Sequence, residues 1–130
     1  MLAFKNWVAL ALFLFGTTFL WMTRDFLADR RAGTGSVWTI VQVFALLAIV
    51  GFAAAAWGLF KGTSWWEPVA VGSAMVGLAT LIPYVIGIVQ LRQLGDGGVR
   101  INIAMHALGV VAVLAMVVVP LVHRWFAERI

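Results

Sequence analysis

Four long apolar stretches constrain this chain more than any other feature. An α-helix rises about 1.5 Å per residue, so roughly 20 apolar residues cross a hydrocarbon core of about 30 Å. The four stretches cover approximately residues 6–23, 37–60, 68–91 and 101–122. They lack the polar–apolar alternation of a membrane barrel strand, which favours helices over strands. The sequence therefore predicts four membrane-spanning helices.

The composition excludes a soluble domain. Hydrophobic residues make up 64% of the 130 residues and charged residues 11%, whereas a soluble domain is about 45–50% apolar and about 25% charged. Disorder is excluded as well, because it requires low hydrophobicity. We expect an all-α integral membrane four-helix bundle with short loops, in which residues 1–130 form a single transmembrane domain. No signal peptide is expected, since no small-residue cleavage site ends the first apolar stretch.

Polar and helix-breaking residues mark the borders of the spans. Ser36 is the expected N-cap of the second helix. Ser64 has capping-box spacing before the third, and Pro68 also allows a cap one or two residues later. Pro83 and Pro120 lie inside the third and fourth stretches, where we expect them to kink the helix or loosen a turn. An additional interfacial turn of helix is expected between residues 23 and 31.

The charged residues define two sides but do not orient the chain. Four crossings place both termini and the loop 61–67 on one side, named X, and the other two loops on the opposite side, named Y. The basic residues on side X are Lys5, Lys61, Arg124 and Arg129, and those on side Y are Arg24, Arg30, Arg31, Arg92 and Arg100. Because the two sides carry nearly equal numbers of basic residues, the positive-inside rule does not predict the orientation of the chain. We favour the interpretation that other factors fix the orientation. The alternative is that the chain inserts in both orientations and forms an antiparallel dimer.

Uncharged polar residues from all four spans fall at a common depth. Since no Asp, Glu, Lys or Arg lies mid-span, His106 is the one candidate proton carrier. The polar positions lie roughly 7–11 Å below the Y-side ends of the helices, and Asn102 and His106 share a helix face. We expect a ligand-binding pocket in the Y half and a dry, closely packed X half. The candidate pocket residues are Thr17, Gln42, Thr80, Tyr84, Asn102, His106 and, at the rim, Arg100. The competing interpretation is that these groups only form interhelical hydrogen bonds.

Small residues form a second pattern, on the second span. Ala48, Gly51, Ala55 and Gly58 share one side of this helix, with the spacing that lets membrane helices approach closely. Packing inside the bundle is the favoured interpretation. However, Gln42 points almost the opposite way, so a Gln42 that faces the pocket would leave the small face for an oligomer contact.

The chain lacks the residues that most cofactor and metal sites require. It has no cysteine, which excludes disulfides and thiolate sites. His106 and His123 are about 25 Å apart along one helix and cannot ligate the same iron, and no other histidine or carboxylate lies in the polar layer. We expect no cofactor, no metal and no nucleic-acid partner. The layout resembles several small four-helix bacterial membrane families, DoxX-like proteins among them, but layout alone implies no function.

Three functions remain open from the sequence. The first is a non-enzymatic accessory or assembly subunit of the cell membrane, or a binder of a lipid-like molecule. Its expected partners are membrane lipid and either further copies of the chain or a larger complex. The second is a membrane enzyme for a quinone, isoprenoid or sterol, with His106 as acid and base. The third is an antiparallel dimeric channel or exporter.

Overall fold

The computed structural model describes residues 3–23, 35–92 and 94–130. The helices are α1 (Phe4–Thr17), the 3-10 helix η1 (Thr18–Met22), α2 (Ser36–Phe60), α3 (Trp66–Gln90), α4 (Gly97–Val118) and α5 (Pro120–Ala127). Four segments are long and apolar enough to cross a membrane: α1 with η1, α2, α3 and α4. The described part of the chain contains no strand. The predicted all-α membrane four-helix bundle is confirmed.

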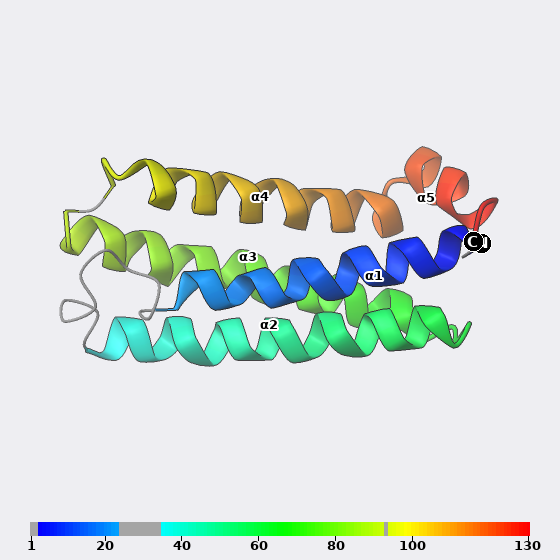
Figure 1. Ribbon diagram of the computed structural model, residues 1–130, viewed down its shortest axis with the longest axis horizontal. Coiled ribbons are helices and arrows are strands. Elements are labelled where there is room, and N and C mark those ends of the chain that lie inside the picture. Colours follow the sequence, from blue (N-terminus) through cyan, green and yellow to red (C-terminus); the bar gives the residue numbers. More distant parts are fainter. Residues whose placement is uncertain (1–2, 24–34, 93) are drawn as a thin grey trace.

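The spanning helices lie side by side (Figure 1). Both ends of the chain and the α2–α3 connection lie at one end of the bundle, which corresponds to side X. α2 packs against α1 on one flank and α3 on the other, and α4 packs on α3. α4 approaches the first span mainly through η1. The seam between α1 and α4 is therefore closed near side Y and looser towards side X.

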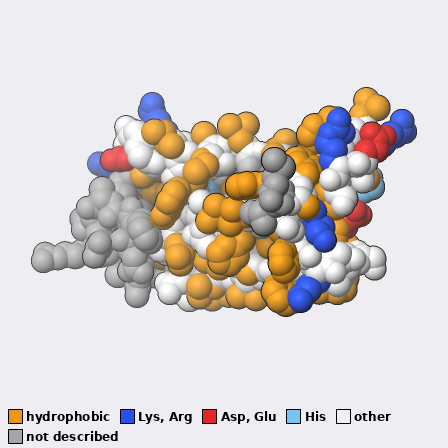
Figure 2. Space-filling view, turned by 45° about the vertical axis from the view of Figure 1, so that its right-hand side comes forward, with side chains coloured by type: hydrophobic (Ala, Val, Ile, Leu, Met, Phe, Trp, Pro, Cys, Tyr) orange, Lys and Arg blue, Asp and Glu red, His pale blue; other side chains and the backbone are white. Residues whose placement is uncertain are grey.

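The outer surface has the polarity expected in a bilayer. Apolar side chains cover the flank of the bundle and charged side chains gather at its ends (Figure 2). Large hydrophobic residues point outward from three different helices: Val50 is 66% exposed, Ile82 66% and Leu108 71%. Because lipid tails solvate such side chains and water does not, this surface fits a multi-pass membrane protein.

The small-residue face of α2 lies against α3. A Cβ atom on Gly51 would lie 2.1 Å from the Ser73 hydroxyl oxygen, and one on Gly58 would lie 2.8 Å from the Trp65 ring. Ala48 and Ala55 are fully buried. Gly51 therefore permits close approach of α2 and α3, and Gly58 leaves room for the Trp65 ring just before α3.

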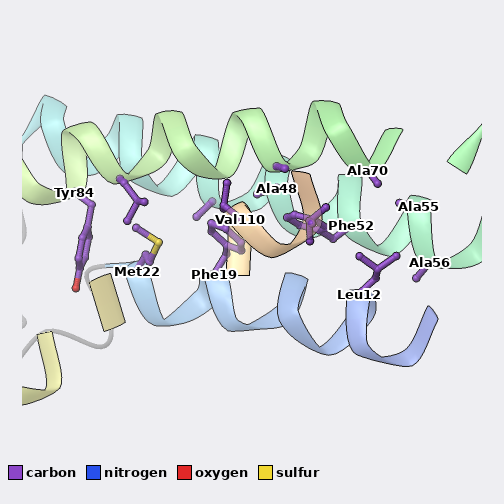
Figure 3. Close-up of a cluster of buried hydrophobic side chains, with 14 of the residues drawn as sticks. Leu12, Phe19, Met22, Ala48, Phe52, Ala55, Ala56, Ala70, Tyr84 and Val110 are labelled. Atoms are coloured by element: carbon purple, nitrogen blue, oxygen red, sulfur yellow. The ribbon is translucent and has the colours of Figure 1, made fainter. Parts of the chain in front are cut away.

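An aromatic cluster joins α1, η1 and α2 at mid-depth. The Phe15 ring meets the Phe19 and Phe52 rings edge to face at centroid distances of 5.5 and 5.3 Å. Phe19 and Phe52 are fully buried, and Figure 3 shows both pointing into the space between the helices, with Val110 of α4 beside them. Aromatic side chains bury large areas and contribute additional edge-to-face attraction. This cluster separates the two halves of the bundle.

Proline ends α4 instead of bending it. α4 stops at Val118, short of the expected end near residue 122, and Pro120 begins the separate helix α5. Val119 between them is extended, with φ −78° and ψ 118°, because the residue before a proline avoids the α conformation. Pro120 is suited to the first turn of α5, where its missing N–H would have no intrahelical partner. Pro83, in contrast, lies inside α3 as expected.

The cap of α2 lies one residue before the expected Ser36, whereas that of α3 lies within the expected range. Gly35 is the N-cap of α2 and Trp65 that of α3, and neither helix has a side-chain cap hydrogen bond. Gly35 has φ 112°, a conformation that glycine adopts without strain. Asp96 caps α4, where its carboxylate accepts a hydrogen bond from the Val99 N–H at 3.1 Å. The interfacial turn expected at residues 23–31 lies outside the described residues beyond Thr23.

Candidate functional site

A network of hydrogen bonds joins η1, α3 and α4 in the Y half of the bundle. The Asn102 amide nitrogen donates to the Trp21 carbonyl oxygen at 2.7 Å and to the Tyr84 hydroxyl at 3.1 Å. The His106 ring connects the Asn102 carbonyl oxygen, 2.8 Å from Nδ1, to the Thr18 hydroxyl, 3.1 Å from Nε2. We name these five residues, Thr18, Trp21, Tyr84, Asn102 and His106, the polar clasp.

The partners of His106 determine its tautomer. A carbonyl oxygen only accepts, so Nδ1 carries the proton that is donated to Asn102. In the neutral ring, Nε2 is then an acceptor, and it shares the single Thr18 hydroxyl proton with the Phe15 carbonyl oxygen, to which the same hydroxyl also donates. The ring is fully buried, and its centroid lies 4.6 Å from that of Phe19 in an edge-to-face contact. Both ring nitrogens are therefore occupied by protein atoms.

Tyr84 lies at the Y end of the buried core, as Figure 3 shows. Its side chain is 1% exposed, and the Trp38 ring of α2 meets it edge to face at 5.9 Å. Trp38 itself is only 4% exposed. Gly87 makes this position possible, because a Cβ there would lie 2.7 Å from the indole. α2 therefore reaches the polar layer through an aromatic side chain.

Three of the seven residues expected in the pocket belong to the clasp: Tyr84, Asn102 and His106. Thr17 lies outside it and donates to the Leu14 carbonyl at 2.7 Å. Thr80 is fully buried but donates to the Val76 carbonyl of its own helix at 2.7 Å. For the seven residues as a set, ligand binding stays a prediction.

The other two expected residues also lie apart from the clasp. Arg100 is exposed and its Nε donates to the Leu94 carbonyl oxygen at 2.8 Å. Gln42 is half-buried, and none of the hydrogen bonds within the described residues connects it to the clasp. Thr18, which the sequence analysis missed, occupies the place expected for Thr17. The adjacent threonine pair was the available signal, but hydropathy does not distinguish its two members.

One clasp atom is buried without a partner within the described residues. The Asn102 side-chain oxygen has no hydrogen-bond donor there. The opposite assignment of the amide would place an oxygen against the Trp21 carbonyl, so the observed orientation is the favourable one. The clasp thus retains one acceptor, while its other polar contacts tie η1 to α3 and α4.

A groove opens between α1 and α4 in the X half. It has a volume of about 300 Å³. Its lining is Val8, Ala11, Leu12, Phe15, Gly109, Ala112, Val113, Met116 and Phe126. The close packing expected for the X half is absent along this seam, because small side chains of the two helices face each other where α4 no longer approaches α1.

A second cavity, of about 200 Å³, lies beside α5 at the X end. Its lining is Trp66, Glu67, Met116, His123, Phe126, Ala127 and Ile130. Glu67 and His123 form a polar contact of 3.1 Å between Oε1 and Nε2, which ties α5 to the start of α3. Phe4 packs on the Phe126 ring at 5.8 Å and so ties α5 to α1. Since Met116 and Phe126 line both spaces, the groove and this cavity are neighbours at the X end.

No protein-family model, curated protein or solved structure matches this chain. A functional proposal for this protein therefore rests on the geometry of its structure. Within the described residues no group of three or more His, Asp or Glu side chains is placed to hold a metal ion. The arrangement offers two chemically different regions: a clasp whose polar groups mostly bind one another, and an apolar groove that lies next to a cavity lined by a carboxylate and an imidazole.

Proposed function

We propose that this protein is a non-enzymatic accessory protein of the cell membrane that binds a lipid-like amphiphile in the α1–α4 groove. The position of the groove next to the X-end cavity is the observation that carries the proposal. Met116 and Phe126 line both spaces, whose volumes are about 300 and about 200 Å³. Ligand pockets are typically mostly apolar clefts of about 300–1,000 Å³ with a few polar groups that fix orientation.

The lining suggests the chemistry of the ligand. Every residue that lines the groove is apolar, which suits a hydrocarbon chain. At the X end, the Glu67 carboxylate uses one of its acceptor positions for His123 and has others to offer. A hydroxyl or amide head group would donate to this carboxylate. The expected ligand is therefore a linear apolar chain with an uncharged, hydrogen-bonding head.

The geometry of His106 favours binding over catalysis. A general acid or base needs a ring nitrogen within hydrogen-bond reach of the reacting proton. Nε2 faces the Thr18 hydroxyl and Nδ1 the Asn102 carbonyl oxygen, and the Phe15 and Phe19 rings lie against the imidazole. A substrate would have to displace these contacts, so the enzyme alternative gains no support from this site.

Filling the groove is the direct test of this proposal. Ala112 lines the groove and is exposed, so Ala112→Phe places a ring in the ligand's space without entering the core. We expect native mass spectrometry of gently extracted protein to show a small molecule on the wild type. In Ala112→Phe its occupancy falls at least about tenfold, which corresponds to about 1.4 kcal/mol of binding free energy.

Ala104→Phe is the matched control. Ala104 is also an exposed alanine of α4, but it lines neither of the two cavities. This variant should retain the small molecule at the wild-type level. Equal retention in both variants, or a wild type that carries no small molecule, would contradict the proposal.

A further inference from the structure

A second apolar groove lies on the opposite flank of α1, against α2. It has a volume of about 410 Å³. Its lining is Asn6, Ala9, Leu10, Phe13, Ala53, Ala56, Trp57 and Phe60. Asn6 is the one polar side chain in this lining and lies near the X end of α1. The groove is thus apolar along its length and polar at its X-side mouth.

Two lysines stand at this mouth. The Lys61 ammonium lies 4.8 Å from the centroid of the Trp57 ring, which itself lines the groove. The Lys5 ammonium lies 3.9 Å from the position that a Cβ on Gly62 would occupy, so it reaches the turn that follows Lys61. α1 and the end of α2 therefore each place a cation at the X-side end of the groove.

The positive charge of these lysines is not balanced by a described acidic residue. Two ion pairs form among residues 3–23, 35–92 and 94–130: Glu67 with His123, and Glu128 with Arg129. Neither includes Lys5 or Lys61. A charge of this kind beside an apolar groove is complementary to an anionic head group with a hydrocarbon chain. Lysine side chains also reach readily from an apolar surface to the head-group level.

We propose that an anionic glycerophospholipid of the surrounding bilayer binds here, with one acyl chain in the α1–α2 groove and its phosphate between Lys5 and Lys61. The Asn6 amide is placed to donate a further hydrogen bond to the head group. This site differs from the amphiphile site in its position, on the other flank of α1, and in its chemistry, a charged head instead of an uncharged one.

The lysines favour a lipid over a parallel second copy of the chain in this groove. A parallel second copy would bring four ammonium groups to the same level of the membrane, where their repulsion opposes association. A phospholipid instead supplies one negative charge at that level and a chain of the right polarity below it. Charge complementarity therefore selects the lipid.

The test compares head groups in one membrane. The full chain is reconstituted in bilayers of equal parts phosphatidylglycerol and phosphatidylcholine, and the retained lipid is counted by native mass spectrometry. We expect the wild type to retain phosphatidylglycerol preferentially. The double variant K5Q/K61Q should lose about thirtyfold of this preference, as expected for two basic contacts near the membrane surface.

The control removes the same charge from the same end of the bundle. R124Q/R129Q lowers the net charge equally but changes residues that line neither groove, so it should keep the lipid preference. An unchanged preference in K5Q/K61Q would overturn the proposal, and so would an equal loss in the control, which would indicate diffuse surface attraction.

A steric variant separates this site from the amphiphile site. Ala53→Phe fills the α1–α2 groove and should lower phosphatidylglycerol retention, whereas Ala112→Phe on α4 should leave it unchanged. The co-purified amphiphile should be lost in Ala112→Phe and retained in Ala53→Phe. K5Q/K61Q should retain it as well. Loss of phosphatidylglycerol in Ala112→Phe but not in Ala53→Phe would contradict the assignment to this groove.

Discussion

Replacement of Gly51 by leucine is expected to destabilise the bundle by about 3 kcal/mol. A Cβ on Gly51 would lie 2.1 Å from the Ser73 hydroxyl oxygen and 3.0 Å from the Ser73 Cβ. Ser73 is short and its hydroxyl is bonded to the Val69 carbonyl, so it has little freedom to move aside. α2 and α3 must then separate, and the contacts along the interface of Ala48 and Ala55 are lost.

Gly72 provides the matched control on the other helix. A Cβ there meets no atom within 4 Å, and leucine has the better helix propensity. Gly72→Leu should therefore leave stability unchanged or raise it by up to about 1 kcal/mol. Denaturant titration in detergent micelles, followed by circular dichroism, measures both variants. Equal destabilisation by the two leucines would show that close approach at Gly51 is not what holds α2 to α3.

Removal of the His106 side chain should be nearly as costly, whereas a change of its chemistry should not. The imidazole is fully buried and packs on Phe15 and Phe19, so His106→Ala leaves a cavity that costs about 3 kcal/mol. His106→Phe keeps a ring of similar size and should cost less than about 1.5 kcal/mol. The same unfolding measurement compares the two variants.

The partners of His106 explain the expected tolerance of phenylalanine. Without the imidazole, the single Thr18 hydroxyl proton goes to the Phe15 carbonyl alone, and the Asn102 carbonyl lies inside α4, where helical N–H groups are available. No buried group loses its last partner, which is the costly case. Retention of the amphiphile should also survive in His106→Phe. If phenylalanine were as damaging as alanine, the hydrogen bonds and not the packing would give His106 its importance.

Hydropathy predicted the spans because the bilayer thickness sets the length of a spanning helix, and an apolar stretch of that length can be recognised in the sequence. The depth of the polar layer was partly predictable as well, since Asn102 and His106 share a face through helical spacing alone. The choice between adjacent threonines was not predictable. It depends on the change from α to 3-10 winding at Thr18, which rotates the side chains of η1 relative to a continuous helix.

The grooves could not be predicted from the sequence. Their existence depends on how the volumes of facing side chains add up once the helices are in place, as at Ala11 and Ala112. The burial of Trp38 likewise requires the absence of a side chain at Gly87 on a different helix. The pattern of residues along the sequence does not show which side chains of different helices face each other. Packing therefore decided where space remains, and three of the seven residues expected to bind a ligand, Tyr84, Asn102 and His106, form hydrogen bonds with one another.

Photolabelling of the wild-type protein tests the central claim most directly. A long-chain fatty alcohol with a diazirine group near its end is added to protein in lipid bilayers, activated by light, and mapped by peptide mass spectrometry. The account predicts labelled residues concentrated on the α1–α4 groove, at Ala11 and Ala112, and protected by excess unlabelled alcohol. Labelling spread evenly over lipid-facing residues such as Val50, Ile82 and Leu108, with no excess in the groove, would contradict it.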